Sequence, residues 1–193
     1  MSQKKVLMLA GDAVEALEVM YPYYRLLEEG CDVTIAAPSK KKLQTVVHDF
    51  TGWDTYEEKS GYLLESHAAF RDVNAEEFDG LVIPGGRAPE YIRLDPHVGE
   101  IVKHFFLADK PVAAICHASL IFETIPEVIK GRSLTAYIAC KPGVEMAGGT
   151  YVTNSTFHVD GNLVSAHAWP DLPVFMRAFM ELLNGRQANA NVS

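Results

Sequence analysis

The most informative segment of the chain is Pro111-Val112-Ala113-Ala114-Ile115-Cys116-His117-Ala118. Apolar residues of a buried strand lead directly into helix-forming residues, and no turn residue separates the two. A strand-to-helix junction this sharp is typical of a nucleophile elbow, whose apex side chain stands at the edge of a sheet. Cys116 occupies that apex, so the stretch predicts a cysteine at the carboxyl end of a buried strand.

Short apolar runs alternate with helix-length segments on both sides of this stretch. The alternation predicts an α/β fold in which helices cover both faces of a mostly parallel sheet. Residues 39–61 are less regular, and we expect them to pack onto the edge of the sheet. Strands are expected at 6–10, 31–37, 81–84, 112–115, 134–136, 151–153, 157–159 and 163–166, and helices at 14–29, 98–107, 117–125 and 172–183.

Length and charge limit the domain organisation and the partners. The chain has 193 residues, which suits one α/β domain over residues 1–184 followed by a flexible polar tail over 185–193. Lys and Arg number 17 against 25 Asp and Glu, a net charge of −8, which disfavours nucleic acid and anionic membrane surfaces as partners.

No apolar run is long enough for a membrane span, and the first strand is too short for a secretory signal. Three cysteines are too few for a disulfide framework, so we expect a reducing, cytoplasmic location.

Three segments that directly follow predicted strands form one candidate pocket, because ligands of an open parallel sheet bind at the carboxyl ends of its strands. These segments are residues 11–15, 84–87 and 116–119. At the elbow, the amides of a helix N-terminus favour the thiolate, so we expect the pKa of Cys116 to be lowered; the alternative is a buried, inert cysteine. The backbone N–H groups at Gly85 and Gly86 would form an oxyanion hole with the N–H after Cys116, although glycine pairs also mark ordinary turns.

Acidic and imidazole side chains supply the remaining candidates. Glu15 begins the first predicted helix, where it either compensates the helix dipole or points at the thiol as a protonated hydrogen-bond donor. His117 adjoins Cys116, but neighbouring side chains often diverge, so its role as a base depends on geometry. His48 and His167 are candidates to enter the pocket from loops. The histidines and cysteines lack the spacing of a metal site, and we expect no metal and no cofactor.

Several motifs together carry a family resemblance. They are residues 14–22 (VEALEVMYP), 78–90 (FDGLVIPGGRAPE), 111–117 (PVAAICH), 159–165 (VDGNLVS) and 46–50 (VVHDF). With these motifs the chain resembles the ThiJ/PfpI (DJ-1) superfamily over nearly its whole length. It is most similar to the PfpI intracellular protease branch and to the repeated, glyoxalase III-like domains of plant DJ-1 paralogues. The resemblance implies a flavodoxin-like three-layer sandwich with a nucleophilic cysteine at the elbow.

The resemblance also implies roles for individual residues. Cys116 matches the nucleophile, Glu15 the carboxyl that hydrogen-bonds it, and His117 the histidine beside it. The strand end at Gly85 and Gly86 matches the oxyanion hole. Glu90 matches an acid that reaches a neighbouring subunit's site and orients that histidine, so we expect self-association to a dimer or a hexamer.

Three activities are compatible with this pattern. We favour a glyoxalase or deglycase, independent of glutathione and metal, in which Cys116 attacks a small α-oxoaldehyde such as methylglyoxal and a hydroxy acid is released. The same thiolate and oxyanion hole would serve an intracellular cysteine peptidase or amidase that acts on small or unfolded peptides. The third alternative is a non-enzymatic stress sensor or chaperone in which Cys116 is oxidised to a sulfinate. The fold alone does not choose among them.

Overall fold

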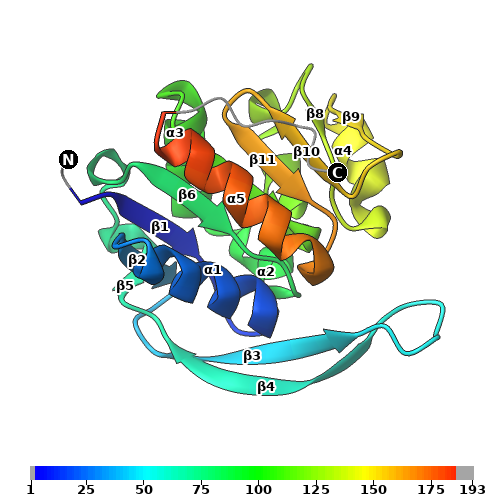
Figure 1. Ribbon diagram of the computed structural model, residues 1–193, viewed down its shortest axis with the longest axis horizontal. Helices are drawn as coiled ribbons and strands as arrows, with labels where there is room; N and C mark the ends of the chain where they lie inside the picture. Colours follow the sequence, from blue (N-terminus) through cyan, green and yellow to red (C-terminus); the bar gives the residue numbers. More distant parts are fainter. Residues whose placement is uncertain (1–2, 186–193) are drawn as a thin grey trace.

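A mostly parallel sheet forms the centre of the computed structural model, which describes residues 3–185 (Figure 1). Its seven strands lie in the order β10-β11-β7-β6-β1-β2-β5, and every neighbouring pair is parallel except β10 and β11. The predicted α/β fold is therefore confirmed. The strands are β1 (Lys5–Leu9), β2 (Asp32–Ala37), β5 (Ala68–Ala69), β6 (Gly80–Ile83), β7 (Val112–Ile115), β10 (Phe157–Asp160) and β11 (Leu163–Ala166).

The central strands are buried on both faces, which is why their sequences are continuously apolar instead of alternating. Every residue of β6 and β7 is buried. Ile83 of β6 pairs with Ala114 of β7, so the two strands end side by side. Gly85 and Cys116 follow these strand ends, and the register therefore brings the two motifs together.

Helices cover both faces of the sheet. The long helices α1 (Ala16–Glu28) and α5 (Leu172–Leu183) pack on one face, in front of the sheet in Figure 1. The other face is covered mainly by α3 (Pro96–Leu107) and α4 (Lys141–Met146), while the short α2 (Ala88–Ile92) follows β6. Among the helices within residues 3–185, none has both the length and the apolar character needed to cross a membrane.

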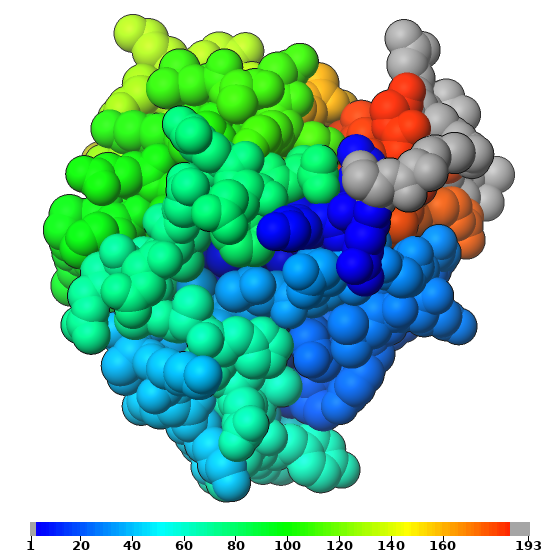
Figure 2. Space-filling model, turned by 90° about the vertical axis from the view of Figure 1, so that its left-hand side faces the viewer, coloured from blue at the N-terminus to red at the C-terminus, as the bar shows by residue number. Residues whose placement is uncertain are grey.

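A long antiparallel hairpin, β3 (Lys42–Asp49) and β4 (Glu57–Glu65), lies outside the central sheet and forms one end of the molecule (Figures 1 and 2). The sequence predicts an irregular segment over residues 39–61, and this prediction is wrong. Most of β4 is exposed to solvent, so its residues are largely polar and show no alternation that would indicate a strand.

Two further expectations were wrong in detail. Residues 117–125, expected as one helix, form separate 3₁₀ turns at Cys116–Leu120 and Phe122–Thr124. The strands expected at 134–136 and 151–153 are the two-residue strands β8 (Ser133–Leu134) and β9 (Thr150–Tyr151), which pair with each other outside the central sheet. The apolar residues of these two segments are buried although most of the segments are irregular. Burial therefore produced the apolar runs from which longer strands were predicted. Beyond Gly185, the tail expected over 185–193 lies outside the described residues.

Gly86 is a position where the fold requires glycine. Its φ is +73°, and an added Cβ would collide with the Ala13 carbonyl and the Glu15 amide. Gly131 has a similar φ of +78°, but it has open space around it.

We predict that Gly86→Ala lowers the free energy of unfolding by about 2–4 kcal/mol, from backbone strain and overpacking together, and that Gly131→Ala lowers it by about 1 kcal/mol from strain alone. Urea denaturation measures both losses, and equal losses would contradict the close packing at Gly86.

Candidate active site

Cys116 lies at the apex of a tight bend between β7 and the 3₁₀ turn that follows. Its φ is +60°, a left-handed conformation that costs a non-glycine residue about 1–2 kcal/mol. The residue is only 5% exposed. Strained backbone of this kind clusters at functional sites, and it distinguishes Cys116 from the other buried free cysteines, Cys31 and Cys140.

The end of β6 closes one side of the thiol. A Cβ added at Gly85 would lie 2.6 Å from the Cβ of Cys116, so a residue with a side chain does not fit there. The backbone N–H groups of Gly86 and His117 hydrogen-bond the Cys116 sulfur. Two amides that converge on a nucleophile in this way can also stabilise an oxyanion formed next to it.

The carboxyl that contacts the thiol belongs to Glu18, in the first turn of α1. Glu18 is 1% exposed, accepts the Gly85 N–H at 2.9 Å and hydrogen-bonds the Cys116 side chain. Burial, reinforced by the negative charge of Glu15, raises the pKa of Glu18 to about 8. Glu18 therefore holds a proton at neutral pH and can donate a hydrogen bond to the sulfur.

Glu15 caps the helix instead, and the expectation that it faces the thiol was wrong. Its Oε2 accepts the Glu18 N–H at 2.8 Å, which directs the side chain along the first turn, as at other N-caps. Its backbone pairs with Val46 of the hairpin. The remaining oxygen, Oε1, is buried without a hydrogen-bond partner, and burial raises the pKa of this carboxyl as well.

The thiol also differs from the sequence expectation, because the pKa of Cys116 is raised well above its ordinary value. Burial is the main cause, and the nearby Glu18 carboxyl adds to it. The hydrogen bonds from Gly86 and His117 act in the opposite direction, but they do not outweigh the loss of solvent. The resting side chain is therefore a neutral thiol at physiological pH.

His117 is placed to accept that proton. Its Nδ1 lies 3.2 Å from the Cys116 sulfur, so the two neighbouring side chains converge. Burial, with the charge of His48, lowers the pKa of His117 to about 4. The imidazole is therefore neutral at physiological pH and has a lone pair available to act as a general base.

Aromatic rings surround His117 on the side of the hairpin. Tyr137 stacks on His117 with ring centroids 4.9 Å apart, and Tyr56 meets it edge-on at 5.9 Å. His48 stacks on Tyr56 at 4.0 Å, and the ring of His167 lies 5.5 Å from that of Tyr137. Each candidate histidine thus reaches His117 through a tyrosine. Around His117 the four rings form an aromatic wall that consists of His48, Tyr56, Tyr137 and His167.

The Glu90 carboxyl forms no hydrogen bond with these groups within residues 3–185, although its negative charge adds to burial, the main cause, in raising the pKa of Tyr56. Glu90 is exposed on α2, and its backbone carbonyl accepts a hydrogen bond from Arg93 Nε at 3.2 Å. A role at a neighbouring subunit's site stays a prediction. Among the described residues, no group of three or more His, Cys, Asp or Glu side chains is placed to hold a metal ion.

Glu18, Tyr56 and Tyr137 were missed by the sequence analysis. One signal for Glu18 was available, because it falls on the face of α1 that is buried with Val19 and Leu26. An acid on the apolar face of an amphipathic helix is an unusual, and therefore informative, residue. No comparable pattern marked the two tyrosines, which approach His117 from distant segments of the chain.

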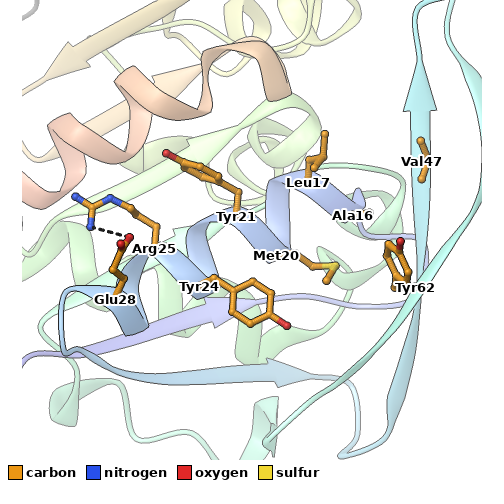
Figure 3. A pocket seen from close by; sticks show the side chains of 9 residues that line it. All are labelled: Ala16, Leu17, Met20, Tyr21, Tyr24, Arg25, Glu28, Val47 and Tyr62. Carbon is orange, nitrogen blue, oxygen red and sulfur yellow. Dashed lines mark ion pairs between the residues drawn. The ribbon is translucent and has the colours of Figure 1, made fainter.

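An apolar groove between α1 and the hairpin is separate from this site (Figure 3). The side chains of Leu17, Met20 and Tyr24 on α1 face Val47 and Tyr62 on the hairpin there. The groove is lined by none of the residues that surround the thiol.

Comparison of the chain with known proteins identifies its family. A model of the DJ-1/PfpI family matches residues 4–182. The chain belongs to the DJ-1/PfpI family. DJ-1 homolog D of Arabidopsis thaliana is 43% identical over 94% of this chain, which spans only 48% of that protein, about half its length. Deglycase PfpI of Pyrococcus furiosus is 40% identical, and the match covers 93% of this chain and 99% of that one.

Solved structures of the DJ-1/PfpI family share the fold. A two-domain protein of Anabaena variabilis, with DJ-1/ThiJ/PfpI-like and ferritin-like domains, superposes with a TM-score of 0.83 at 27% identity, covering 99% of this chain and 50% of that one. DJ-1β of Drosophila melanogaster superposes with a TM-score of 0.79 at 23% identity, covering 94% and 91% of the two chains. The predicted flavodoxin-like architecture is therefore confirmed.

The buried acid gives a stability prediction. Glu18 has a folded-state pKa of about 8, above the ordinary value of 4.5, so its contribution to stability is fully present below pH 4.5 and is lost as the pH rises to 8. Glu18→Gln removes this titration, and at pH 7 it should raise the free energy of unfolding by about 2–3 kcal/mol. The gain should be larger at pH 8 than at pH 5 in urea denaturation. Glu28→Gln, on the exposed part of the same helix, is the matched control, and a gain independent of pH would contradict the prediction.

Proposed function

We propose that this protein is a cysteine-dependent deglycase and glyoxalase that acts on small α-oxoaldehydes and their early adducts without glutathione. The observation that carries the proposal is the convergence of a neutral base, a protonated acid and two amides on one sulfur. His117 Nδ1 lies 3.2 Å from the sulfur, and Glu18 and the amides of Gly86 and His117 hydrogen-bond it. The set contains a nucleophile, a base, an acid and an oxyanion hole.

The relatives support the chemical class. Deglycase PfpI matches this chain along nearly its whole length at 40% identity. A second protein described as a deglycase, from Thermococcus kodakarensis, is also 40% identical and covers 93% of this chain and 99% of that one. Removal of an early glycation adduct and conversion of a free α-oxoaldehyde begin from the same carbon and require the same nucleophile, so we assign both to one site.

The thiol proton moves to His117 Nδ1 as the carbon–sulfur bond forms, because the lowered pKa of His117 and the raised pKa of Cys116 do not allow a separate, stable thiolate. The sulfur attacks the aldehyde carbon, and the amides of Gly86 and His117 stabilise the alkoxide until it is protonated to a hemithioacetal. Glu18, which is protonated because its pKa is about 8, supplies the proton to the alkoxide and becomes a carboxylate. This carboxylate takes the proton from the attacked carbon and returns it to the neighbouring carbonyl carbon, while the hydroxyl proton passes to the other oxygen, and the product is a thioester. Water cleaves the thioester and restores the thiol. Methylglyoxal and one water thus become lactate, and no external oxidant or reductant is needed.

Burial of the site favours small substrates over peptides. Cys116 is 5% exposed and His117 is 8% exposed, and the tyrosine rings enclose the histidine. A peptidase needs a cleft in which an extended chain can reach the sulfur. This contrast is the physical reason to rank the glyoxalase and deglycase activity above the peptidase alternative.

Lactate formation is the direct test. Purified protein with methylglyoxal and no glutathione should release lactate, and Cys116→Ser should abolish it because the oxygen is a far weaker nucleophile. His117→Ala should reduce kcat by about 100- to 10,000-fold, since general base catalysis contributes that much. Cys31→Ser is the matched control, because that cysteine is also buried and free but directly precedes β2, at the amino ends of the strands, whereas Cys116 follows a carboxyl end.

The alternative activities give different results. Cleavage of casein or a small peptide without lactate formation would favour the peptidase. If neither product forms, and the intact mass shows that peroxide adds two oxygens to Cys116 alone, the hypothesis of a non-enzymatic sensor replaces that of an enzyme. Full activity of Cys116→Ser would contradict every form of the proposal.

We also propose self-association, with Glu90 contributing to a neighbouring site. An exposed acid on α2, the helix that directly follows the oxyanion-hole glycines, supports it. Light scattering at micromolar concentration should report a dimer or a hexamer, and Glu90→Gln should reduce kcat without a change in mass. A monomer with full activity would contradict this role.

A further inference from the structure

The two halves of the β3–β4 hairpin are held to the rest of the molecule by different kinds of contact. At its base, the backbone of Val46 bonds the Val14 carbonyl at 2.9 Å, and the Gln44 carbonyl accepts the Ala13 N–H at 2.7 Å. The outer half, around His48 and residues 56–58, has no such backbone pairing to the body within residues 3–185. Side chains therefore fix its position.

A junction of three side chains is one of the contacts that hold the outer half, beside the ring contacts Phe50–Trp169 and Tyr56–Tyr137. Glu58 of β4 accepts two hydrogen bonds from Arg87, from Nε to Oε2 and from Nη2 to Oε1, each 2.7 Å long. The same Oε2 lies 2.9 Å from His48 Nε2 on β3. Such two-point pairing of a guanidinium with a carboxylate is both strong and geometrically specific. Arg87 and His48 together lower the pKa of Glu58 to about 2, so the carboxylate stays ionised throughout the physiological range.

The junction connects directly to the site. Arg87 follows Gly86, whose N–H bonds the Cys116 sulfur. At the other end, His48 is 3% exposed and stacks on Tyr56, which contacts the His117 ring edge-on. A second contact reinforces this placement, because Trp169 Nε1 donates to the His48 carbonyl at 3.1 Å. The ion pair thus links the oxyanion-hole strand end to the aromatic wall.

We propose that the Arg87–Glu58–His48 junction is a latch that keeps the outer half of the hairpin against the site and thereby limits the size of the electrophile that reaches Cys116. The inference rests on the proposed function for its substrate, an α-oxoaldehyde. Loss of the latch leaves the nucleophile, the base and the amides in place but frees the wall formed by His48 and Tyr56. Larger electrophiles then gain access, while small ones react as before. Glu58 and Arg87 are positioning residues in this scheme, because they act through the wall and do not touch the reacting atoms.

Alkylation of Cys116 tests the latch without reference to turnover. Second-order rate constants are measured for a small reagent, iodoacetamide, and a bulky one, pyrenylmaleimide, with the labelled cysteine identified by peptide mass. Glu58→Gln should raise the rate with the bulky reagent about tenfold, equivalent to about 1.4 kcal/mol, and leave the iodoacetamide rate nearly unchanged. Lys59→Gln is the matched control, since Lys59 pairs with Asp49 across the same hairpin and with Glu57 on its own strand but faces solvent. It should change neither rate.

A second variant keeps the test decisive if Glu58→Gln fails to fold. Arg87→Gln should give the same selective increase, and the double variant should exceed neither single variant, because both changes open one junction. An equal rise for both reagents, no rise for either, or multiplicative effects in the double variant would overturn the proposal.

The same variants separate the latch from the proposed function. If the latch and the function are both correct, Glu58→Gln raises kcat/KM for phenylglyoxal relative to methylglyoxal. If wild-type protein forms no hydroxy acid from either compound but alkylation shows the selective rise, the proposed function fails and the latch is retained.

Discussion

The close approach of the β6 strand end to Cys116 is the constraint on which the site depends. Because Gly85 has no side chain, the Glu18 carboxyl, the thiol and the His117 amide occupy adjacent space around it. The parallel register of β6 and β7 places these strand ends together, and the buried sheet supplies the rigidity that maintains the positive φ of Cys116. The geometry of the site is therefore a property of the sheet and not of a flexible loop.

Burial then determines the charge state of the site. The same loss of solvent raises the pKa values of Glu18 and Cys116 and lowers that of His117, so all three groups are neutral near physiological pH. The site is therefore a neutral set in which His117 Nδ1 lies 3.2 Å from the Cys116 sulfur. The buried acid costs stability, and the apolar clusters on both faces of the sheet offset that cost.

The hairpin and the α/β core have different tasks. The core positions Cys116, His117 and the glycines at the end of β6, and its fold is shared by structures with TM-scores of 0.83 and 0.79. The hairpin contributes His48, Tyr56 and Glu58, which form and anchor the wall around His117. Differences in substrate between members of one fold are expected to arise from such peripheral elements, since loops and additions vary more than the sheet.

Local patterns in the chain were enough to predict the alternation of strands and helices, the elbow at Cys116 and the neighbouring glycines, because burial and backbone freedom leave such patterns. The three-dimensional packing was needed to show which acid faces the thiol. Glu15 and Glu18 share one helical turn, and the N-cap bond turns the first away while the second points at β6. The packing also shows that the Cys116 and His117 side chains converge and that a largely exposed, polar segment forms the regular hairpin. These features depend on contacts between segments distant in the chain, and such contacts have no signature in local periodicity.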